Sequence, residues 1–359
     1  ALALSTPAAL TGCLHAARGE SRAERFQSPA PSARERYCAW YADERDGTLY
    51  FGAAAFWSAM RAHGNDPLAD LLDEGPVVVG RFDLRREHML APLEVGRAGD
   101  RSGVWDVLAH PNGRIFFTTF FESAGYTDPG SGAMQRLPDL GTGLNELALG
   151  PDGSLLASRY DAGSIAHFDS DGALLGEYPL DAPPGYRAAP KTIAYDPLRA
   201  EIWVTSDSLP LDPADPIRHE SYVLGAAGEP LQRVAEPELQ FVRFARDGTG
   251  YRAEVEGRNL WLQISDPGAG PQSGSRILLD AAFPAALDFV QDIELMRDGR
   301  AVVTRWSGWI HVVESPRVVR TTRLPELEAG GLYYSAFAER DRICATYCAD
   351  LSVVCADLP

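Results

Sequence analysis

One pattern of apolar and polar positions recurs along the chain. Apolar and polar residues alternate over a short stretch, an Asp-Gly or Asn-Gly turn follows, and a second stretch is rich in aromatic and β-branched residues. Alternation with a period of two is typical of half-buried strands, and such a turn between two runs predicts a β-hairpin. The clearest copies, 105–117 and 145–156, superpose without a gap. The pattern therefore predicts an all-β protein built from many short hairpins.

Seven copies of this turn can be placed, including two degenerate ones, and successive copies lie 40 to 66 residues apart. That spacing is typical of propeller blades. The anchors are Gly47, Gly113, Gly153, Ala200, Gly248, Gly299 and Arg342. A second hairpin follows in several copies, most clearly at 164–178, so each copy supplies about four strands. We predict a single β-propeller with mostly four-stranded antiparallel blades, seven in number, with six as the alternative.

The first and last copies differ from the rest. The last holds only about three strands between Tyr333 and Leu358. An N-terminal strand within Glu24 to Ser32 would complete it and remove the open edge of the ring. The long first interval contains 57–74, where leucine spacing predicts a short helical excursion over one face. The expected propeller spans 37–359.

The N-terminal residues carry a possible export signal. Segment 1–12 is small and apolar, like the remnant of a signal peptide, and is too short to span a bilayer. Leu10-Thr11-Gly12-Cys13 resembles the lipobox of bacterial lipoproteins, which implies a lipid on Cys13, a tether over 13–36 and a periplasmic or cell-surface location. An ordinary signal remnant or a disordered N-terminus is the alternative.

The composition limits the classes of molecule that the protein is expected to bind. The 359 residues carry a formal net charge of −17 and no strong basic run. A surface of that sign repels phosphate backbones and anionic lipid, which argues against nucleic acid and leaves membrane contact only through a lipid on Cys13. Four further cysteines, an even number, predict two disulfides in an exported chain: Cys38, Cys344, Cys348 and Cys355.

The pairing of these cysteines is partly constrained. Cys344 and Cys348 lie four residues apart in one expected strand, roughly 13 Å end to end, so they should not pair with each other. Cys38 belongs to the first blade and the other three to the last. We expect one bridge to join the two ends of the chain.

The repeat also nominates residues around a central channel, because the innermost strands of a propeller converge there. Residues that open the inner strands are Trp105, Asp106, Asn145, Glu146, Lys191, Thr192, Gln240, Gln291, Asp292, Tyr334 and Ser335. Residues that end the following strand are Glu122, Arg159, Tyr160, Asp207, Arg305 and Trp306. This polar and aromatic set is the predicted ligand-binding channel.

Segments 145–160 and 163–172 resemble the blade pattern of the gluconolactonase (regucalcin), strictosidine-synthase-like and NHL-repeat propellers. In the gluconolactonase-like proteins, residues at inner-strand openings hold a metal ion. The resemblance implies Ca²⁺ on Asn145, Glu146 and Asp292, with Asp292 as the catalytic carboxylate. Glu146 replaces the family's glycine, and Asp292 lies one residue beyond the family's aspartate, where Gln291 stands. Lys191 adds a cation near the axis.

A structural role is the alternative for these carboxylates. In that reading Asp106, Glu146 and Asp292 make inter-blade hydrogen bonds or ion pairs with Lys191, Arg159 and Arg305. No two histidines lie three to five residues apart, which argues against a histidine-based zinc site. His110 and His219 are expected in turns or loops.

Two functions follow. The preferred one is an exported, non-catalytic binding or scaffold propeller that takes a protein, glycan or small ligand at its channel mouth. The alternative is a Ca²⁺-dependent lactonase or esterase of the gluconolactonase-like class.

Overall fold

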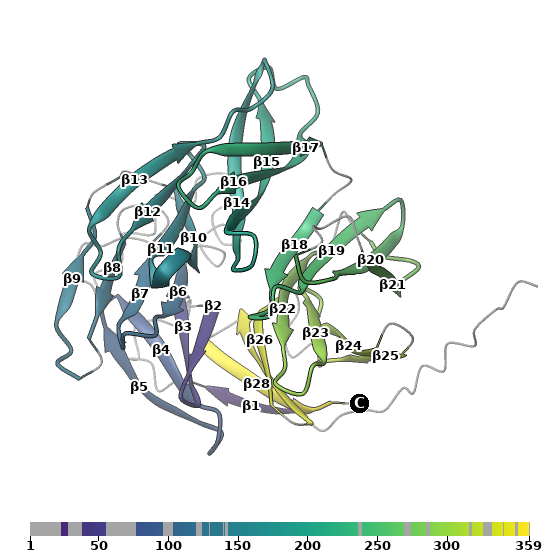
Figure 1. The fold of residues 1–359 in the computed structure, drawn as a ribbon. Helices are drawn as coiled ribbons and strands as arrows, with labels where there is room; N and C mark the ends of the chain where they lie inside the picture. The colour runs from purple at the N-terminus through teal and green to yellow at the C-terminus, as the bar shows by residue number, and fades with distance from the viewer. Residues whose placement is uncertain are drawn as a thin grey trace, which may run out of the picture.

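The computed structural model describes residues 23–27, 38–54, 77–95, 103–119, 124–128, 130–138, 140, 143–235, 239–268, 274–284, 288–315, 318–325, 332–339, 341–348 and 351–358. In this part of the chain, seven four-stranded antiparallel sheets stand around a central axis (Figure 1). Each first strand contacts the first strand of the next sheet, all the way round. The protein is a seven-blade β-propeller, as predicted.

The strands of each blade follow one another in the chain, except in the last blade. Blades 1 and 2 are β2 (Cys38–Arg45), β3 (Thr48–Ala54), β4 (Val78–Asp83), β5 (His88–Glu94), β6 (Asp106–Ala109), β7 (Ile115–Thr118), β8 (Ala124–Thr127) and β9 (Met134–Arg136). Blades 3 and 4 are β10 (Leu144–Leu149), β11 (Leu155–Arg159), β12 (Ser164–Phe168), β13 (Leu174–Pro179), β14 (Tyr186–Asp196), β15 (Glu201–Pro210), β16 (Arg218–Gly225) and β17 (Pro230–Ala235).

Blades 5 and 6 are β18 (Leu239–Phe244), β19 (Gly250–Glu256), β20 (Asn259–Ser265), β21 (Ser275–Asp280), β22 (Val290–Leu295), β23 (Ala301–Arg305), β24 (Trp309–Ser315) and β25 (Val318–Arg323). Blade 7 contains β26 (Leu332–Glu339), β27 (Arg342–Cys348), β28 (Leu351–Asp357) and the N-terminal β1 (Glu24–Gln27). A short 3-10 helix, Pro151–Gly153, lies in the first turn of blade 3.

The repeated turns connect the first and second strands of the blades. Six of the seven sequence anchors have the left-handed backbone that such turns require, including Gly113 at φ 102° and Gly153 at φ 73°. Ala200 adopts the same conformation at φ 54° in the degenerate copy of blade 4. The spacing of the turns therefore reported the blades correctly, even where glycine was absent.

Apolar side chains fill the interfaces between neighbouring blades. The cluster between blades 1 and 7 contains the fully buried Phe51 and Val353, and other clusters join the remaining neighbours in the same way. Alternation along each strand sends apolar side chains to both flanking interfaces. The core is therefore a series of apolar layers between blades. The polar residues at the openings of the inner strands lie outside these layers and face the channel.

The ring is closed by the segment in which a closing strand was expected. β1 pairs with β28 in antiparallel register, with Glu24 opposite Cys355 and Phe26 opposite Val353. Phe26 also packs on Phe82 of blade 1 at a ring distance of 5.3 Å. The first described strand of the chain thus completes the last blade and contacts the first one.

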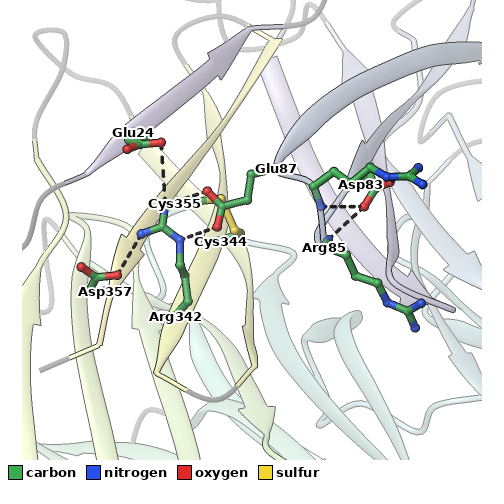
Figure 2. Close-up of a disulfide and its surroundings, with 9 residues drawn as sticks. Glu24, Asp83, Arg85, Glu87, Arg342, Cys344, Cys355 and Asp357 are labelled. Carbon is green, nitrogen blue, oxygen red and sulfur yellow. Dashed lines mark hydrogen bonds and ion pairs between the residues drawn. A yellow bond between two sulfur atoms is a disulfide. The ribbon is translucent and has the colours of Figure 1, made fainter.

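Arg342 ties the same junction together by charge (Figure 2). Its guanidinium binds Glu87 in the β4–β5 turn of blade 1 and Asp357 of β28, at 2.7 Å and 2.9 Å, with Glu24 of β1 at 3.9 Å. These contacts raise the pKa of Arg342, the Glu87 hydrogen bond contributing most. Ion pairs and strand pairing therefore both stabilise the junction between blades 7 and 1.

The cysteine predictions had mixed outcomes. A disulfide joins Cys344 to Cys355 across the paired strands β27 and β28, so this bridge lies within the last blade and does not join the chain's ends. Cys344 and Cys348 both lie in β27 and do not pair with each other, as predicted. Cys348 is disulfide-bonded as well. A bridge from Cys38 across the ring stays a prediction, because the Cys38 side chain lies outside the described residues.

Other expectations also fall outside the described ranges: the signal remnant 1–12, Cys13 and its lipid, most of the tether, and the 57–74 excursion. Within the described ranges, no helix has the length and hydrophobicity that a membrane crossing requires.

Candidate site at the channel mouth

The seven first strands line the channel, and six of them carry a β-bulge, which lies near the beginning of five strands and in the middle of β14. A bulge adds a residue to one strand and re-aims the side chains beside it. We call the end of the channel where these strands begin the mouth. The mouth residues are Trp40, Trp105, Asn145, Lys191, Gln240, Gln291 and Tyr334, and the next residue in each strand, called a latch residue, is Tyr41, Asp106, Glu146, Thr192, Phe241, Asp292 or Ser335.

All eleven inner-strand positions nominated from the sequence belong to these two sets. The structure therefore brings them to one end of one channel. Glu122 lies outside the described residues, so its expected place at the channel is not described.

Four latch residues accept backbone hydrogen bonds from the following blade. Asp106 Oδ2 accepts from Leu147 N at 2.6 Å and Glu146 Oε2 from Ile193 N at 3.2 Å. Asp292 Oδ2 accepts from Ala336 N at 3.2 Å, and Ser335 Oγ from Ala42 N at 2.9 Å, which carries the pattern across the ring closure. Such bonds satisfy N–H groups on the channel edge of the inner strands. These side chains hold neighbouring blades together, which is the structural role considered from the sequence.

The three cations expected beside these carboxylates have other partners. Lys191 Nζ lies 2.9 Å from Asp207 Oδ1, and Arg159 pairs with Glu177. Arg305 is buried and binds Asp280 and Asp288, each at 2.6 Å. The expected ion pairs with Asp106, Glu146 and Asp292 are therefore wrong, because each cation pairs with another carboxylate: Lys191 and Arg159 within their own blades, and Arg305 with Asp280 of blade 5 and with Asp288. Arg305 is enclosed by its partners and does not line the channel.

The expected calcium ligands do not fit a metal site. Asn145 Oδ1 accepts a hydrogen bond from Trp105 Nε1 at 2.8 Å, and its amide nitrogen donates to Lys191 O at 3.0 Å. Glu146 and Asp292 each use a carboxylate oxygen for a backbone donor. Calcium needs six to eight oxygens around one point. No group of three or more His, Cys, Asp or Glu side chains in the described ranges is arranged to hold a metal ion.

Second strands contribute a belt of hydroxyl groups that the sequence reading missed. Thr118 Oγ1 donates to Asn145 O at 3.3 Å, Ser158 Oγ to Lys191 O at 3.4 Å, and Thr346 Oγ1 to Trp40 O at 2.8 Å. Each reaches the backbone of a mouth residue in the next blade. A Ser or Thr at the equivalent position of several repeats was the available signal.

Below the latch residues, the channel holds one guanidinium among carboxylates. Arg243 Nη2 binds Asp292 Oδ1 at 2.9 Å, and its side chain keeps 45% of its surface exposed while Asp292 keeps 5%. Burial acts to lower the pKa of Arg243, but Asp292, Glu294 and Glu146 outweigh it and raise that pKa. Arg243 lies three residues beyond the nominated Gln240, and Glu294 lies two residues beyond the nominated Asp292. A charged residue within an apolar inner strand was the signal for them.

The neighbouring carboxyls resist ionisation. Burial raises the pKa of Asp43 to about 6, that of Asp106 to about 7, and that of Glu294 to about 8, with Asp292 adding to the effect at Glu294. Burial, followed by the charge of Asp106, raises the pKa of Glu146 well above its usual value. The channel therefore takes up protons near neutral pH.

Glu294→Gln should flatten the dependence of stability on pH. The folded-state pKa of Glu294 lies above its usual value of 4.5, so its contribution to stability is full below that value and is lost as the pH rises through about 8. Between about pH 5 and pH 9, we expect the free energy of unfolding to fall more in the native protein than in Glu294→Gln, by on the order of 2–4 kcal/mol.

Urea unfolding at several pH values would measure this difference. Glu229→Gln, at an exposed carboxyl, is the control and should follow the native curve. Parallel curves for Glu294→Gln and the native protein would contradict the account of the channel.

Aromatic side chains cover one half of the mouth. Trp40 stacks on Trp105 with ring centroids 4.3 Å apart and lies 4.6 Å from Tyr334. Trp306 lies 6.2 Å from Tyr334. Trp40 and Tyr334 are buried, whereas Trp105, Trp306 and Tyr41 are partly exposed. Blades 6, 7, 1 and 2 thus present aromatic surface at the mouth.

Polar groups occupy the other half. Asn145 and Gln240 belong to it, and Gln291 Oε1 accepts a hydrogen bond from Tyr41 Oη at 3.1 Å. Lys191 and Asp207 continue the polar half into blade 4, where His219 Nδ1 lies 2.9 Å from Asp207 Oδ1. His219 is in β16, not in a loop as expected, because β15 and β16 are paired as far as Ser208 and Arg218.

Solved structures with this fold include the virginiamycin B lyase of Staphylococcus aureus, at a TM-score of 0.66 and 12% identity over 95% of this chain and 100% of that chain. A streptogramin B lyase structure gives 0.65 and 14% over 94% and 98%. The Pan2 WD40 domain of Neurospora crassa gives 0.59 and 11% over 92% of each. No protein-family model and no curated protein matches the sequence. At these identities the likeness shows the fold alone.

Proposed function

We propose that this propeller is a binding module that takes a carbohydrate at its channel mouth. The observation that carries the proposal is the division of the mouth into partly exposed aromatic rings, Trp105, Trp306 and Tyr41, and a facing set of amide and charged groups. Aromatic faces pack against the apolar C–H faces of sugar rings, while amides and ammonium groups bond hydroxyls. A binding role also agrees with latch carboxylates that are committed to holding blades together.

Donors remain available on the polar half. The Lys191 ammonium group has three N–H donors, keeps 40% of its side-chain surface exposed, and contacts Asp207 at 2.9 Å. Gln291 uses its carbonyl oxygen for Tyr41, so its amide N–H donors take no part in that bond. Such groups supply direction and specificity beside an apolar platform.

The proposal also includes a location outside the cytoplasm. The Cys344–Cys355 disulfide supports an oxidising environment, consistent with export and with a lipid anchor at Cys13. A lipid there would place the mouth outside the cytoplasm, where polysaccharides are exposed ligands.

Trp306→Ala should weaken carbohydrate binding about tenfold or more, because a stacked indole contributes on the order of 1.5 kcal/mol. A glycan array would identify the ligand, and calorimetry would give its affinity for the native and variant proteins.

Trp309→Ala is the matched control, because Trp309 is also a partly exposed tryptophan of blade 6 but lies on the outer strand β24. Its affinity should equal that of the native protein. Absence of any carbohydrate ligand, or equal losses in the two variants, would refute the proposal.

A further inference from the structure

Three side chains of blade 4 meet at the mouth on adjacent strands. Lys191 of β14 and His219 of β16 contact the same oxygen of Asp207 in β15, Oδ1, each at 2.9 Å. Asp207 is opposite Ala189 on one side and His219 on the other, so the three groups share one face of the blade. Two potential cations therefore flank one carboxylate.

Exposure divides this cluster into an inner acid and two outer nitrogen groups. The Asp207 side chain is 13% exposed, whereas His219 is 34% and Lys191 40% exposed. Burial alone would raise the pKa of Asp207, but its hydrogen bond to His219 and the charge of Lys191 outweigh burial and lower that pKa. Asp207 therefore stays ionised and positions both nitrogen groups toward solvent.

Arg187 adds a third cation on the same face. It lies opposite Leu209, two residues from Asp207 along β15. Its guanidinium donates to Tyr160 O at 3.2 Å and stands 5.8 Å from the Tyr160 ring, which faces blade 4 from blade 3. The described residues give Arg187 no ion pair within 4.0 Å. A cation that is held on a ring without a close carboxylate is unusual in a chain of net charge −17.

We propose that Lys191, His219 and Arg187 form a subsite for the carboxylate of an acidic sugar. This inference rests on the proposed function and names its ligand class, a uronate-containing glycan. The hydrogen-bond path from Trp105 through Asn145 to the backbone of Lys191 links the aromatic platform to this subsite. One sugar ring on the platform and a carboxylate at blade 4 would together fill the mouth.

Trigalacturonate and its neutral methyl ester are a matched probe pair, because they differ at the carboxylate alone. Calorimetry should show that the native protein binds the acid about tenfold more tightly than the ester. Arg187→Met should lose most of the preference while keeping the affinity for the ester, which also shows that the variant folds.

Arg246→Met is the charge-matched control, since Arg246 is exposed in the β18–β19 turn, at the end of the channel opposite the mouth. It should keep the native preference. Equal affinity of the native protein for acid and ester, or an unchanged preference in Arg187→Met, would overturn the carboxylate subsite and leave carbohydrate binding standing. If neither probe binds, but a glycan array shows another neutral ligand, the uronate assignment also fails. If no glycan binds at all, both proposals fail.

Discussion

Arg243→Met should lower the free energy of unfolding by about 3–5 kcal/mol near pH 8, because it leaves enclosed carboxylates without their cation. Arg243 binds Asp292 directly at 2.9 Å and acts on Glu146 and Glu294. Methionine keeps much of the side-chain length, so the loss would report charge more than volume. Urea unfolding monitored by tryptophan fluorescence would measure it.

The size of this effect should depend on pH in a defined direction. Glu294 and Glu146 already have raised pKa values, so acidification neutralises them and removes the repulsion that Arg243 offsets. The loss should therefore be smaller near pH 5.5 than near pH 8. Adding Asp292→Asn to Arg243→Met should recover part of the stability, since it removes the partner that was left uncompensated.

Arg86→Met is the control for this experiment. Arg86 is 79% exposed and pairs with Asp83 at 3.4 Å, so its removal should change stability by less than about 0.5 kcal/mol. A loss at Arg243 as small as that at Arg86, or a loss that grows on acidification, would contradict the role given to Arg243.

Removing β1 should destabilise the ring by on the order of 3 kcal/mol or more and promote self-association. A chain that begins at Ser28 loses the burial of Phe26, about 2 kcal/mol, and the backbone ladder to β28, about 1 kcal/mol for each bond. It also exposes the edge of β28, and an open edge templates pairing with another chain. Thermal unfolding and size-exclusion chromatography would measure both effects.

A chain that begins at Ala23 is the matched control, because it keeps β1 and its pairing with β28. It should remain monodisperse to the same degree as the full chain and unfold at the same temperature. Equal behaviour of the two truncated chains would show that strand pairing contributes little to ring closure.

The blades could be predicted from the sequence because each carries its own local signal. The turns at Gly113, Gly153 and Gly299 recur at blade spacing, and the last repeat lacks one strand that a segment before residue 32 supplies. The channel-facing positions were also predictable, because most nominated inner-strand residues lie at the start of their strands, although Lys191 and Thr192 lie in the middle of β14. The turns and the inner-strand positions are both signalled by residues that lie close together in the sequence.

The partners of those residues could not be predicted in the same way. Asp106 accepts from a backbone N–H 41 residues away, a group that every residue type except proline offers. The residues around a carboxylate in a repeat therefore do not show whether it binds a metal ion or accepts a hydrogen bond from the next blade. Bulges at Asn145 and Gln291 also change which side chain faces the next blade. The residue types around these bulges do not predict them.

The closing strand has a consequence for how the chain reaches its native state. Arg25 and Ser352, joined by a hydrogen bond across the last blade, are separated by 327 positions in the chain. Six blades consist of consecutive strands and can form as the chain lengthens, but blade 7 cannot be completed until β28 has been synthesised. Until then β1 has no partner and its apolar side chain stays exposed. A prematurely terminated product would therefore keep an unpaired leading strand, which gives proteases and chaperones a means to tell it from the finished protein.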